Sequence, residues 1–323
     1  MTNVSNPEQA KPVRRRGDRI FSGISFSAGA LILITLASVA VFLTIEAIPG
    51  ITASTEEATI LDGESFWSYA WPLVYGTLFA AAIAILIATP LAIAVALFIS
   101  HYAPRRIGQL VGYVVDLLAA VPSVVYGLWG IGFLAGELGP VYRWLADNLG
   151  FIPLFDTNAA GQSYAFSTTG RTIMTASLVL AIMVLPIITA ICREVFLQTP
   201  RLHQEAALAL GATRWEVIRM TVFPYGRSGI IGATMLGLGR ALGETMAVAM
   251  VLSASGVVSL RLLTTTNPTT IPANIALGIK ESSGLNVNVL IASGLMLFII
   301  TFLVNFAARA IVARRKEFSG ADA

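Results

Sequence analysis

The chain has 323 residues, of which 56% are hydrophobic and only 12% are charged. Soluble domains usually carry about 25% charged residues, so this composition excludes an ordinary soluble protein and indicates an integral membrane protein. The formal net charge of +3 is small, and in a membrane protein the positions of Lys and Arg matter more than their sum. The charge pattern does not indicate binding to nucleic acid.

The first 20 residues are polar and carry five basic side chains, a composition that does not bury itself in a fold. We predict a cytoplasmic tail over residues 1–20. The apolar stretch from Phe21 to Ile48 is longer than the ~20 helical residues that a bilayer core requires. It is also longer than the apolar region of a cleaved signal peptide. We therefore predict a first transmembrane helix, ended by Pro49 and Gly50.

Five further apolar stretches predict transmembrane helices, which makes six in all. The predicted spans cover residues 73–99, 107–134, 172–192, 225–253 and 289–312. Two long loops on the outer side separate them. The first, residues 135–171, is predicted to contain a short amphipathic helix at about 141–149, and the second, residues 254–287, a short re-entrant helix. The permease domain is predicted to span residues 21–313, followed by a cytoplasmic tail at 314–323.

One cysteine and two histidines limit the chemistry of the chain. The single cysteine, Cys192, excludes an internal disulfide and a cysteine metal cluster. His101 and His203 are far apart in sequence, and neither has a metal-ligating neighbour at the usual spacing. We therefore predict neither a metal site nor a bound cofactor.

The distribution of the 21 basic residues predicts the orientation of the chain. With six spans and both termini inside, 16 of them fall on the cytoplasmic side, four fall outside, and Arg240 lies within a span. Cytoplasmic loops carry an excess of Lys and Arg. Both termini and the loop at residues 198–224 are therefore predicted to be cytoplasmic.

The loop at residues 198–224 is predicted to form two short helices. Thr199 can cap a first helix that starts at Pro200, and Gly211 stands where a left-handed residue would end it. Thr213 and Glu216 have the spacing of a capping box for a second helix. That helix is predicted to stop before Pro224, because a proline ring disfavours a helical residue ahead of it.

The fifth predicted span holds opposite charges four residues apart, at Arg240 and Glu244. On a continuous helix this spacing places both on one face. Charges inside a membrane usually face a bundle interior or an aqueous cavity, which favours a role in a transport pathway. A structural ion pair that closes the bundle is the alternative. For Asp116, in the third span, a solvated or capping role is favoured.

The cytoplasmic loop resembles the EAA loop of ABC importer permeases, whose pattern is Glu-Ala-Ala, three residues, Gly, nine residues, Ile-x-Leu-Pro. Five residues fall on this pattern, while Thr221 and Phe223 replace its Ile and Leu; the five are Glu205, Ala206, Ala207, Gly211 and Pro224. The resemblance implies that this loop docks on a separate ATP-hydrolysing subunit. An ordinary amphipathic connector is the alternative, and a DNA-reading helix-turn-helix is a poorer one because both ends of the loop join membrane spans.

Three further segments resemble the phosphate-specific ABC importer permeases of the PstC type; they cover residues 71–77, 121–130 and 237–245. The resemblance implies an all-α, six-helix, MetI-like type I importer permease in the inner membrane of a prokaryote. It also implies that Arg240, Glu244 and Thr245 lie on the substrate pathway. Permeases for sulfate or molybdate are the nearer alternative, and an ion-driven transporter that works alone is the more distant one.

The same resemblance implies contact with membrane lipid and three kinds of protein partner, one in the membrane and one on each side of it. They are a second, PstA-like permease subunit, a dimer of PstB-like ATPase subunits and an extracytoplasmic, PstS-like phosphate-binding protein. The chain contains no Gly-x-x-x-x-Gly-Lys-Ser/Thr phosphate loop. We therefore predict that it is not itself an enzyme and that ATP is hydrolysed by the separate subunit.

Overall fold

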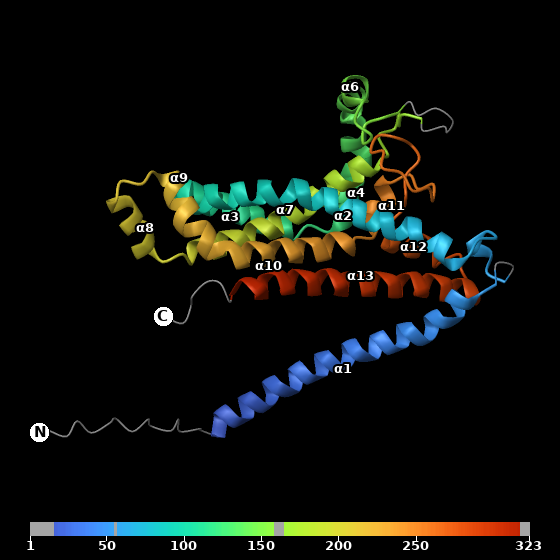
Figure 1. Cartoon of the computed structure of the whole chain (residues 1–323), viewed down its shortest axis with the longest axis horizontal. Coiled ribbons are helices and arrows are strands. Elements are labelled where there is room, and N and C mark those ends of the chain that lie inside the picture. Colours follow the sequence, from blue (N-terminus) through green and yellow to red (C-terminus); the bar gives the residue numbers. More distant parts are fainter. Residues whose placement is uncertain (1–15, 55–56, 158–164, 317–323) are drawn as a thin grey trace, which may run out of the picture. The chain divides into compact units, whose positions relative to one another are not determined.

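A computed structural model describes residues 16–54, 57–157 and 165–316 (Figure 1). Regular structure in these ranges is almost entirely helical, with two isolated β-bridges, so the predicted all-α class is confirmed. The long helices are α1 (Arg16–Thr52), α2 (Phe66–Leu97), α3 (Arg105–Ala119), α7 (Ile173–Leu197), α10 (Phe223–Leu242) and α13 (Leu285–Lys316). The chain divides into two compact units, residues 1–45 and 46–323, which are described separately.

The first unit consists of most of α1, whose large apolar side chains are exposed. The prediction that Pro49 and Gly50 end this helix is wrong, because the helix continues through Pro49 to Thr52. Its apolar span begins at Ile20, close to the predicted start at Phe21. In the second unit, Gly50 lies against the backbone of α13, where an added Cβ would meet the Asn288 carbonyl carbon at 2.4 Å. The Asn288 Nδ2 also donates to the Glu46 carbonyl at 2.8 Å. These contacts hold the last turn in place although a proline removes one helical hydrogen bond.

The centre of the second unit is formed by α2, α7 and α10. One face of α2 carries small, buried side chains at every fourth position, namely Ala80, Ala84, Ala88, Ala92 and Ala96. Small residues at this spacing let two helix axes approach closely. Val184 and Ile188 of α7 are fully buried in the same cluster. The core of this unit is therefore a close helix–helix interface that positions α10.

The third predicted span, residues 107–134, is broken. After α3 the chain turns through 93° and continues as α4 (Ser123–Trp129), a π-helical turn (Gly130–Leu134) and α5 (Ala135–Glu137). Pro122 stands at the break, where it cannot donate to the helix behind it and disfavours helical backbone at the preceding residue. The Tyr126 hydroxyl bridges the break by donating to the Leu118 carbonyl at 2.9 Å.

The fifth predicted span, residues 225–253, is also broken. Its first part, α10, ends at Leu242, and a second helix, α11 (Met246–Val251), follows after three residues. Gly239 and Gly243 lower the helical propensity at this point, and the Glu244 side chain accepts a hydrogen bond at the start of α11. The sequence predicted one span over residues 225–253, because apolar residues continue on both sides of the break.

The end of this unit away from α8 and α9 is built from the two long predicted loops (Figure 1). The predicted short helices are present there as α6 (Gly139–Leu149) and α12 (Ile271–Gly278). Asn267 is fully buried between the loops. Its Nδ2 donates to the Thr264 carbonyl at 3.0 Å, and its Oδ1 accepts from the Ile173 N–H at 3.1 Å. One amide side chain thus ties the second loop to the start of α7.

Among the described residues, four helices are long and apolar enough to cross a membrane, or five if the bent pair at Pro122 is one span. The helix α10 is not among them, because its glycines and Arg227 and Arg240 lower its hydropathy. It nevertheless packs along α7 and α2. The count of six spans therefore stays a prediction.

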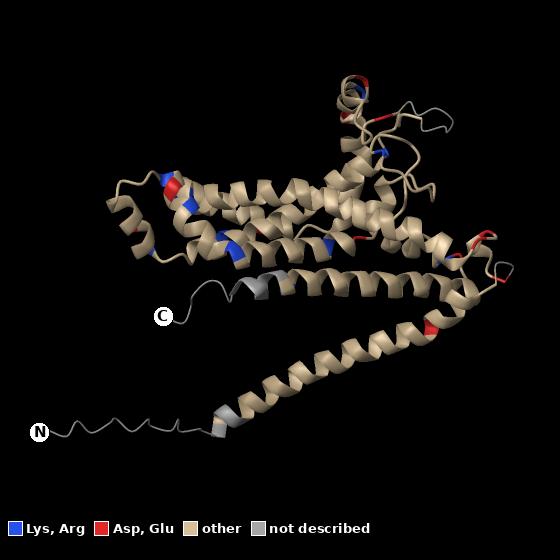
Figure 2. Ribbon diagram, viewed as in Figure 1, with Lys and Arg blue, Asp and Glu red and all other residues tan. Residues whose placement is uncertain are grey.

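Many basic residues of the second unit lie at the end that carries α8 and α9 (Figure 2). By their elements, Arg201, Arg214 and Arg219 belong to the loop that holds these helices and Arg227 to the start of α10, whereas Arg143, Arg171, Arg261 and Lys280 belong to the two long loops. The loops predicted to be external lie at the opposite end (Figure 1). The arrangement agrees with the predicted separation of sides, whereas the side on which each end lies stays a prediction.

Cysteine labelling tests the orientation. In a Cys192→Ser background, cysteines placed at Ser54 or Thr157 are expected to react with a membrane-impermeant thiol reagent added outside intact cells. A cysteine at Ser319, beyond the described residues, is expected to react only after the cells are permeabilised. The expectation follows from the excess of basic residues on one side. The opposite labelling pattern would reverse the orientation and move the loop at 198–224 to the outside.

Candidate functional site

The first helix of the loop at residues 198–224 is α8 (Arg201–Ala209). The prediction that Thr199 caps it is wrong, because Pro200 occupies the position before the helix and makes no side-chain cap. Thr199 is instead buried, at 3% exposure, and its hydroxyl has no hydrogen-bond partner among the described residues. Its carbonyl accepts from the Gln204 Nε2 at 3.2 Å.

The end of α8 has the predicted left-handed glycine. Gly211 has a φ of 87°, and its N–H donates to the Leu208 carbonyl at 2.9 Å. The next N–H, of Ala212, donates to the Ala207 carbonyl at 3.1 Å. This pair of hydrogen bonds is a Schellman motif, which satisfies carbonyls that the helix leaves free and turns the chain sharply. The corner at Gly211 is confirmed.

The second helix, α9 (Arg214–Val217), starts with the predicted capping box. The Thr213 hydroxyl accepts from the Glu216 N–H at 3.4 Å, and the Glu216 carboxylate accepts from the Thr213 N–H at 2.7 Å. The hydrogen bonds that Thr213 donates, from its backbone and its side chain, lower the pKa of Glu216. The carboxylate therefore stays ionised and the box stays formed near neutral pH.

The prediction that this helix stops before Pro224 is wrong. A π-helical turn (Ile218–Val222) follows α9 and leads directly into α10, with Pro224 in its first turn. The Phe223 N–H donates to the Ile218 carbonyl five residues back. The wider turn gives room for the proline ring, and a proline is tolerated where a helix starts. One uninterrupted helical path therefore runs from the capping box at Thr213 to Leu242.

Most side chains of α8 are exposed, and only Gln204 and Ala207 are half-buried. Glu205 is exposed, and the apolar side chains of Leu202 and Leu210 are 77% and 89% exposed. Exposed apolar side chains on a polar loop are typical of a surface that another protein covers. The structure thus places Glu205, Ala206, Ala207 and Gly211 together on α8 and the corner after it, with Pro224 in the first turn of α10.

The predicted pathway residues lie at the break between α10 and α11. Arg240 is exposed in the last turn of α10, whereas Glu244 lies beyond the helix end and is 8% exposed. A Glu244 carboxylate oxygen accepts from the Ala247 N–H at 3.1 Å, and the Thr245 hydroxyl donates to the Gly243 carbonyl at 3.2 Å. No ion pair between Arg240 and Glu244 occurs among the residues that the structure describes. The prediction of both charges on one helix face is therefore wrong, because the helix ends between them.

Arg240 lines a cavity of about 900 Å³ between α10, α7 and α13. The α13 wall includes Asn305 and Arg309, which sequence reasoning missed. They are polar and four residues apart in an otherwise apolar stretch, and this spacing puts them on one helix face. That pattern could have identified the lining of a cavity from the sequence.

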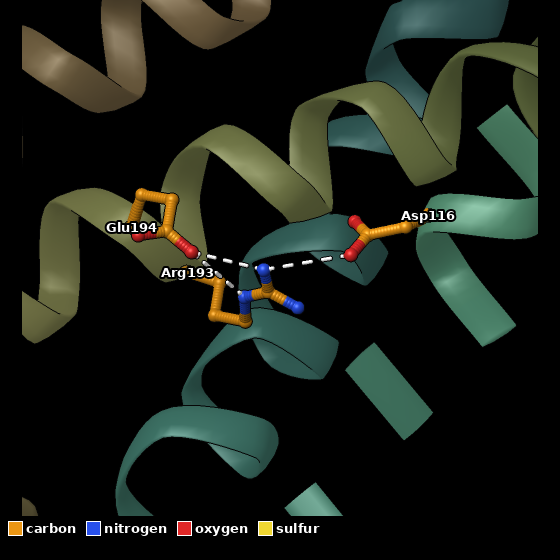
Figure 3. A network of polar contacts seen from close by, with 3 residues as sticks. All are labelled: Asp116, Arg193 and Glu194. Carbon is orange, nitrogen blue, oxygen red and sulfur yellow. Dashed lines mark hydrogen bonds and ion pairs between the residues drawn. The ribbon is translucent and has the colours of Figure 1, made fainter. Parts of the chain in front are cut away.

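A second set of charges joins α3 to α7 (Figure 3). The Arg193 guanidinium lies 3.7 Å from an Asp116 carboxylate oxygen and 2.9 Å from a Glu194 carboxylate oxygen. Gly112 makes room for it, because a Cβ there would lie 2.4 Å from an Arg193 guanidinium nitrogen. Asp116 is 48% exposed, so it is partly solvated and paired and does not cap a helix.

Comparison with known proteins identifies related sequences. Residues 88–317 match the family of binding-protein-dependent transport system inner membrane components. A phosphate transport system permease protein PstC 2 of Mycobacterium tuberculosis is 45% identical over 307 residues, which cover 92% of each chain. The PstC of Mycobacterium leprae is 41% identical over 94% of this chain and 95% of its own.

Solved structures resemble the fold at low sequence identity. A bacterial ABC transporter involved in the import of the acidic polysaccharide alginate has a chain with a TM-score of 0.58 and 17% identity, and the match covers 92% of this chain and 99% of that one. The inward-facing MetNI methionine ABC transporter has a TM-score of 0.52 and 18% identity, over 76% of this chain and 96% of that one. These likenesses confirm the predicted importer-permease fold.

Proposed function

This chain belongs to the family of binding-protein-dependent transport system inner membrane components, and from that premise we propose that it is a permease subunit of an ATP-driven importer of inorganic phosphate. The observation that carries the proposal is the 45% identity to a mycobacterial PstC along 92% of both chains. Members of such a family are transport subunits and not enzymes, so ATP hydrolysis belongs to another subunit.

The partners follow from the same proposal. They are a second, PstA-like permease, a dimer of PstB-like ATPases and a PstS-like extracytoplasmic binding protein. The exposed apolar side chains of α8 and the rigid corner at Gly211 support docking of this loop on the ATPase. In domain terms, residues 1–20 form a basic tail, 21–313 the permease domain with its coupling loop at 198–224, and 314–323 a second cytoplasmic tail.

The uninterrupted helical path from Thr213 to Leu242 supports a mechanism of coupling. A displacement of α8 on the ATPase surface would be passed through α9 and the π-helical turn into α10. Because α10 ends at Leu242, with Arg240 in its last turn, the same movement would reach the break in the fifth span. Rocking of two permease subunits about a central pathway would then expose the substrate to each side in turn.

Arg240 and Glu244 suit a substrate that carries both negative charge and a proton. A guanidinium stays ionised at any physiological pH and offers a fork of donors to an oxyanion. One Glu244 oxygen is used by the Ala247 N–H, and the other can accept a hydrogen bond from a protonated anion. Phosphate near neutral pH keeps such a proton whereas sulfate does not. Thr245, next to Glu244, completes the proposed pathway residues.

Glu244→Gln separates a role in selectivity from a role in capping. The amide oxygen can still accept from the Ala247 N–H, so the assembled amount of the complex is expected to stay near wild type. Preference for phosphate over sulfate is expected to fall by about tenfold, the effect of losing one hydrogen bond to a charged group. Glu244→Ala, the control, removes the cap and should lower assembly as well. Unchanged uptake and preference in Glu244→Gln would leave Glu244 with the capping role alone.

Uptake measurements test the proposed function. In cells without other phosphate importers, deletion of this chain is expected to abolish ATP-dependent uptake of labelled phosphate, and an ATPase subunit is expected to copurify with the native complex. Loss of sulfate or molybdate uptake in place of phosphate uptake would assign the chain to another oxyanion. Transport by the chain without any ATPase would contradict the proposal and favour an ion-driven transporter.

A further inference from the structure

The cavity beside Arg240 runs along one face of α10. The α10 residues that line it recur at intervals of one, three or four, as Ser228, Gly232, Met235, Leu236, Gly239 and Arg240, and therefore share a single helix face. The facing wall is formed by Asn305, Ala308 and Arg309 of α13, together with Ile187 of α7. The cavity is thus an elongated space between two helices.

The glycines of α10 distinguish this face from the packed one. A Cβ at Gly229 would lie 2.4 Å from the Val195 side chain, and a Cβ at Gly237 would lie 2.7 Å from the Ile188 side chain. Those glycines are required for close packing on α7. At Gly232 and Gly239, by contrast, an added Cβ would meet nothing within 4 Å. The glycines on the cavity face therefore serve no packing contact within the chain and leave the space open.

The charge in this cavity is positive and uncompensated. Two guanidinium groups, Arg240 and Arg309, line it together with the polar side chains of Ser228 and Asn305, and the lining contains no Asp or Glu. Neither arginine is in an ion pair among the described residues. A cleft lined by one sign of charge with apolar walls concentrates ions of the opposite sign. Its chemistry suits a small oxyanion.

The two arginines lie on helices that run in opposite directions, Arg240 in the last turn of α10 and Arg309 seven residues before the end of α13 (Figure 1). Arg309 is near the C-terminal end of α13, which lies at the α8–α9 end of the unit (Figure 1). Arg240 is twelve residues beyond Ser228 along α10, which corresponds to about 18 Å at 1.5 Å per residue. The cavity thus joins the break in the fifth span to the end of the unit that carries the coupling loop.

We propose that Arg309 is a second oxyanion-binding residue, which receives the transported anion from Arg240 on its way to the cytoplasm. The inference rests on the proposed function and adds a step to it. Two sites in series let each bind weakly enough to release the ion, as conduction through a pore requires. Gly232 and Gly239 keep the route between them open.

Control of the charge at position 309 tests the proposal. In a Cys192→Ser background, Arg309→Cys is reconstituted with its partner subunits in proteoliposomes and treated with a methanethiosulfonate carrying either a trimethylammonium or a sulfonate group. The cationic product is expected to transport phosphate about tenfold faster than the anionic product, because a fixed positive charge attracts the oxyanion and a fixed negative charge repels it. Arg227→Cys is the matched control. Arg227 is exposed near the start of α10, and it does not line the cavity.

Equal transport by the two Arg309→Cys products, or the same dependence on charge at position 227, would overturn the proposal. Gly232→Leu is a second test, because its side chain would enter open space and should leave assembly intact. Uptake by this variant is expected to fall severalfold, whereas Gly136→Leu, which also enters open space but outside the cavity, should transport normally. Normal uptake by Gly232→Leu would equally rule out the route.

Failure of the proposed function would be seen separately. If the complex without these substitutions carried another oxyanion and no phosphate, the identity of the substrate would be wrong. The comparison of cationic and anionic products at positions 309 and 227 would then be made with the oxyanion that is carried, and it would still support or overturn the role of Arg309.

Discussion

Gly211→Val is expected to uncouple transport while leaving the chain folded in the membrane. The φ of 87° at Gly211 is in the left-handed region, which costs a residue with a Cβ about 1–2 kcal/mol and a β-branched one more. That cost lowers the population of the native corner by a factor of roughly 5–30. Because the corner sets the direction of α8 relative to α9, phosphate uptake and transport-linked ATP hydrolysis should fall together by about that factor.

Two control variants test whether the loss of uptake comes from backbone strain at Gly211 in particular or from backbone strain anywhere in the chain. Gly63→Val has a similar backbone cost, since Gly63 has a φ of 81° and, as at Gly211, an added Cβ meets nothing within 4 Å. Gly63 lies far from the coupling loop, so its variant should retain uptake per assembled complex. Gly211→Asn should also retain uptake, because asparagine tolerates left-handed backbone. Normal uptake by a well-expressed Gly211→Val complex would contradict the proposed coupling role of this loop.

Arg240→Gln is expected to abolish most phosphate uptake without loss of the assembled complex. The side chain is exposed to the cavity and has no ion-pair partner among the described residues, so its removal leaves no buried carboxylate unpaired. A hydrogen bond to a charged group contributes about 1.5–3 kcal/mol. Loss of that interaction should lower uptake by roughly tenfold to a hundredfold, measured as initial rate per assembled complex.

Arg227→Gln and Arg240→Lys are the matched controls for this change. Arg227→Gln removes the same charge from α10 outside the cavity and should transport normally. Arg240→Lys keeps the charge but loses the forked donors, and should give an intermediate rate. Wild-type phosphate transport by Arg240→Gln would eliminate its role in the pathway.

The sequence by itself determined the class of the protein and several of its helix ends and turns. Apolar stretches longer than a bilayer identify most spans because hydropathy is a property of the residues alone. The Schellman corner at Gly211 and the capping box at Thr213 and Glu216 were also predictable, because their hydrogen bonds form within a few residues of chain. The family resemblance likewise rested on short segments, namely the EAA pattern and residues 71–77, 121–130 and 237–245.

Only the tertiary structure decided where the long helices break and where they continue. The helix at Pro49 continues because Gly50 packs on α13, and the one at Pro224 continues through a π-helical turn, whereas the helices at Pro122 and Gly243 break. A proline or a glycine stands in each of these places, so the residue type alone does not distinguish a break from a continuation. The cavity that brings Arg309 to the same space as Arg240 likewise depends on the packing of α13 beside α10, since the two residues are 69 positions apart in the sequence.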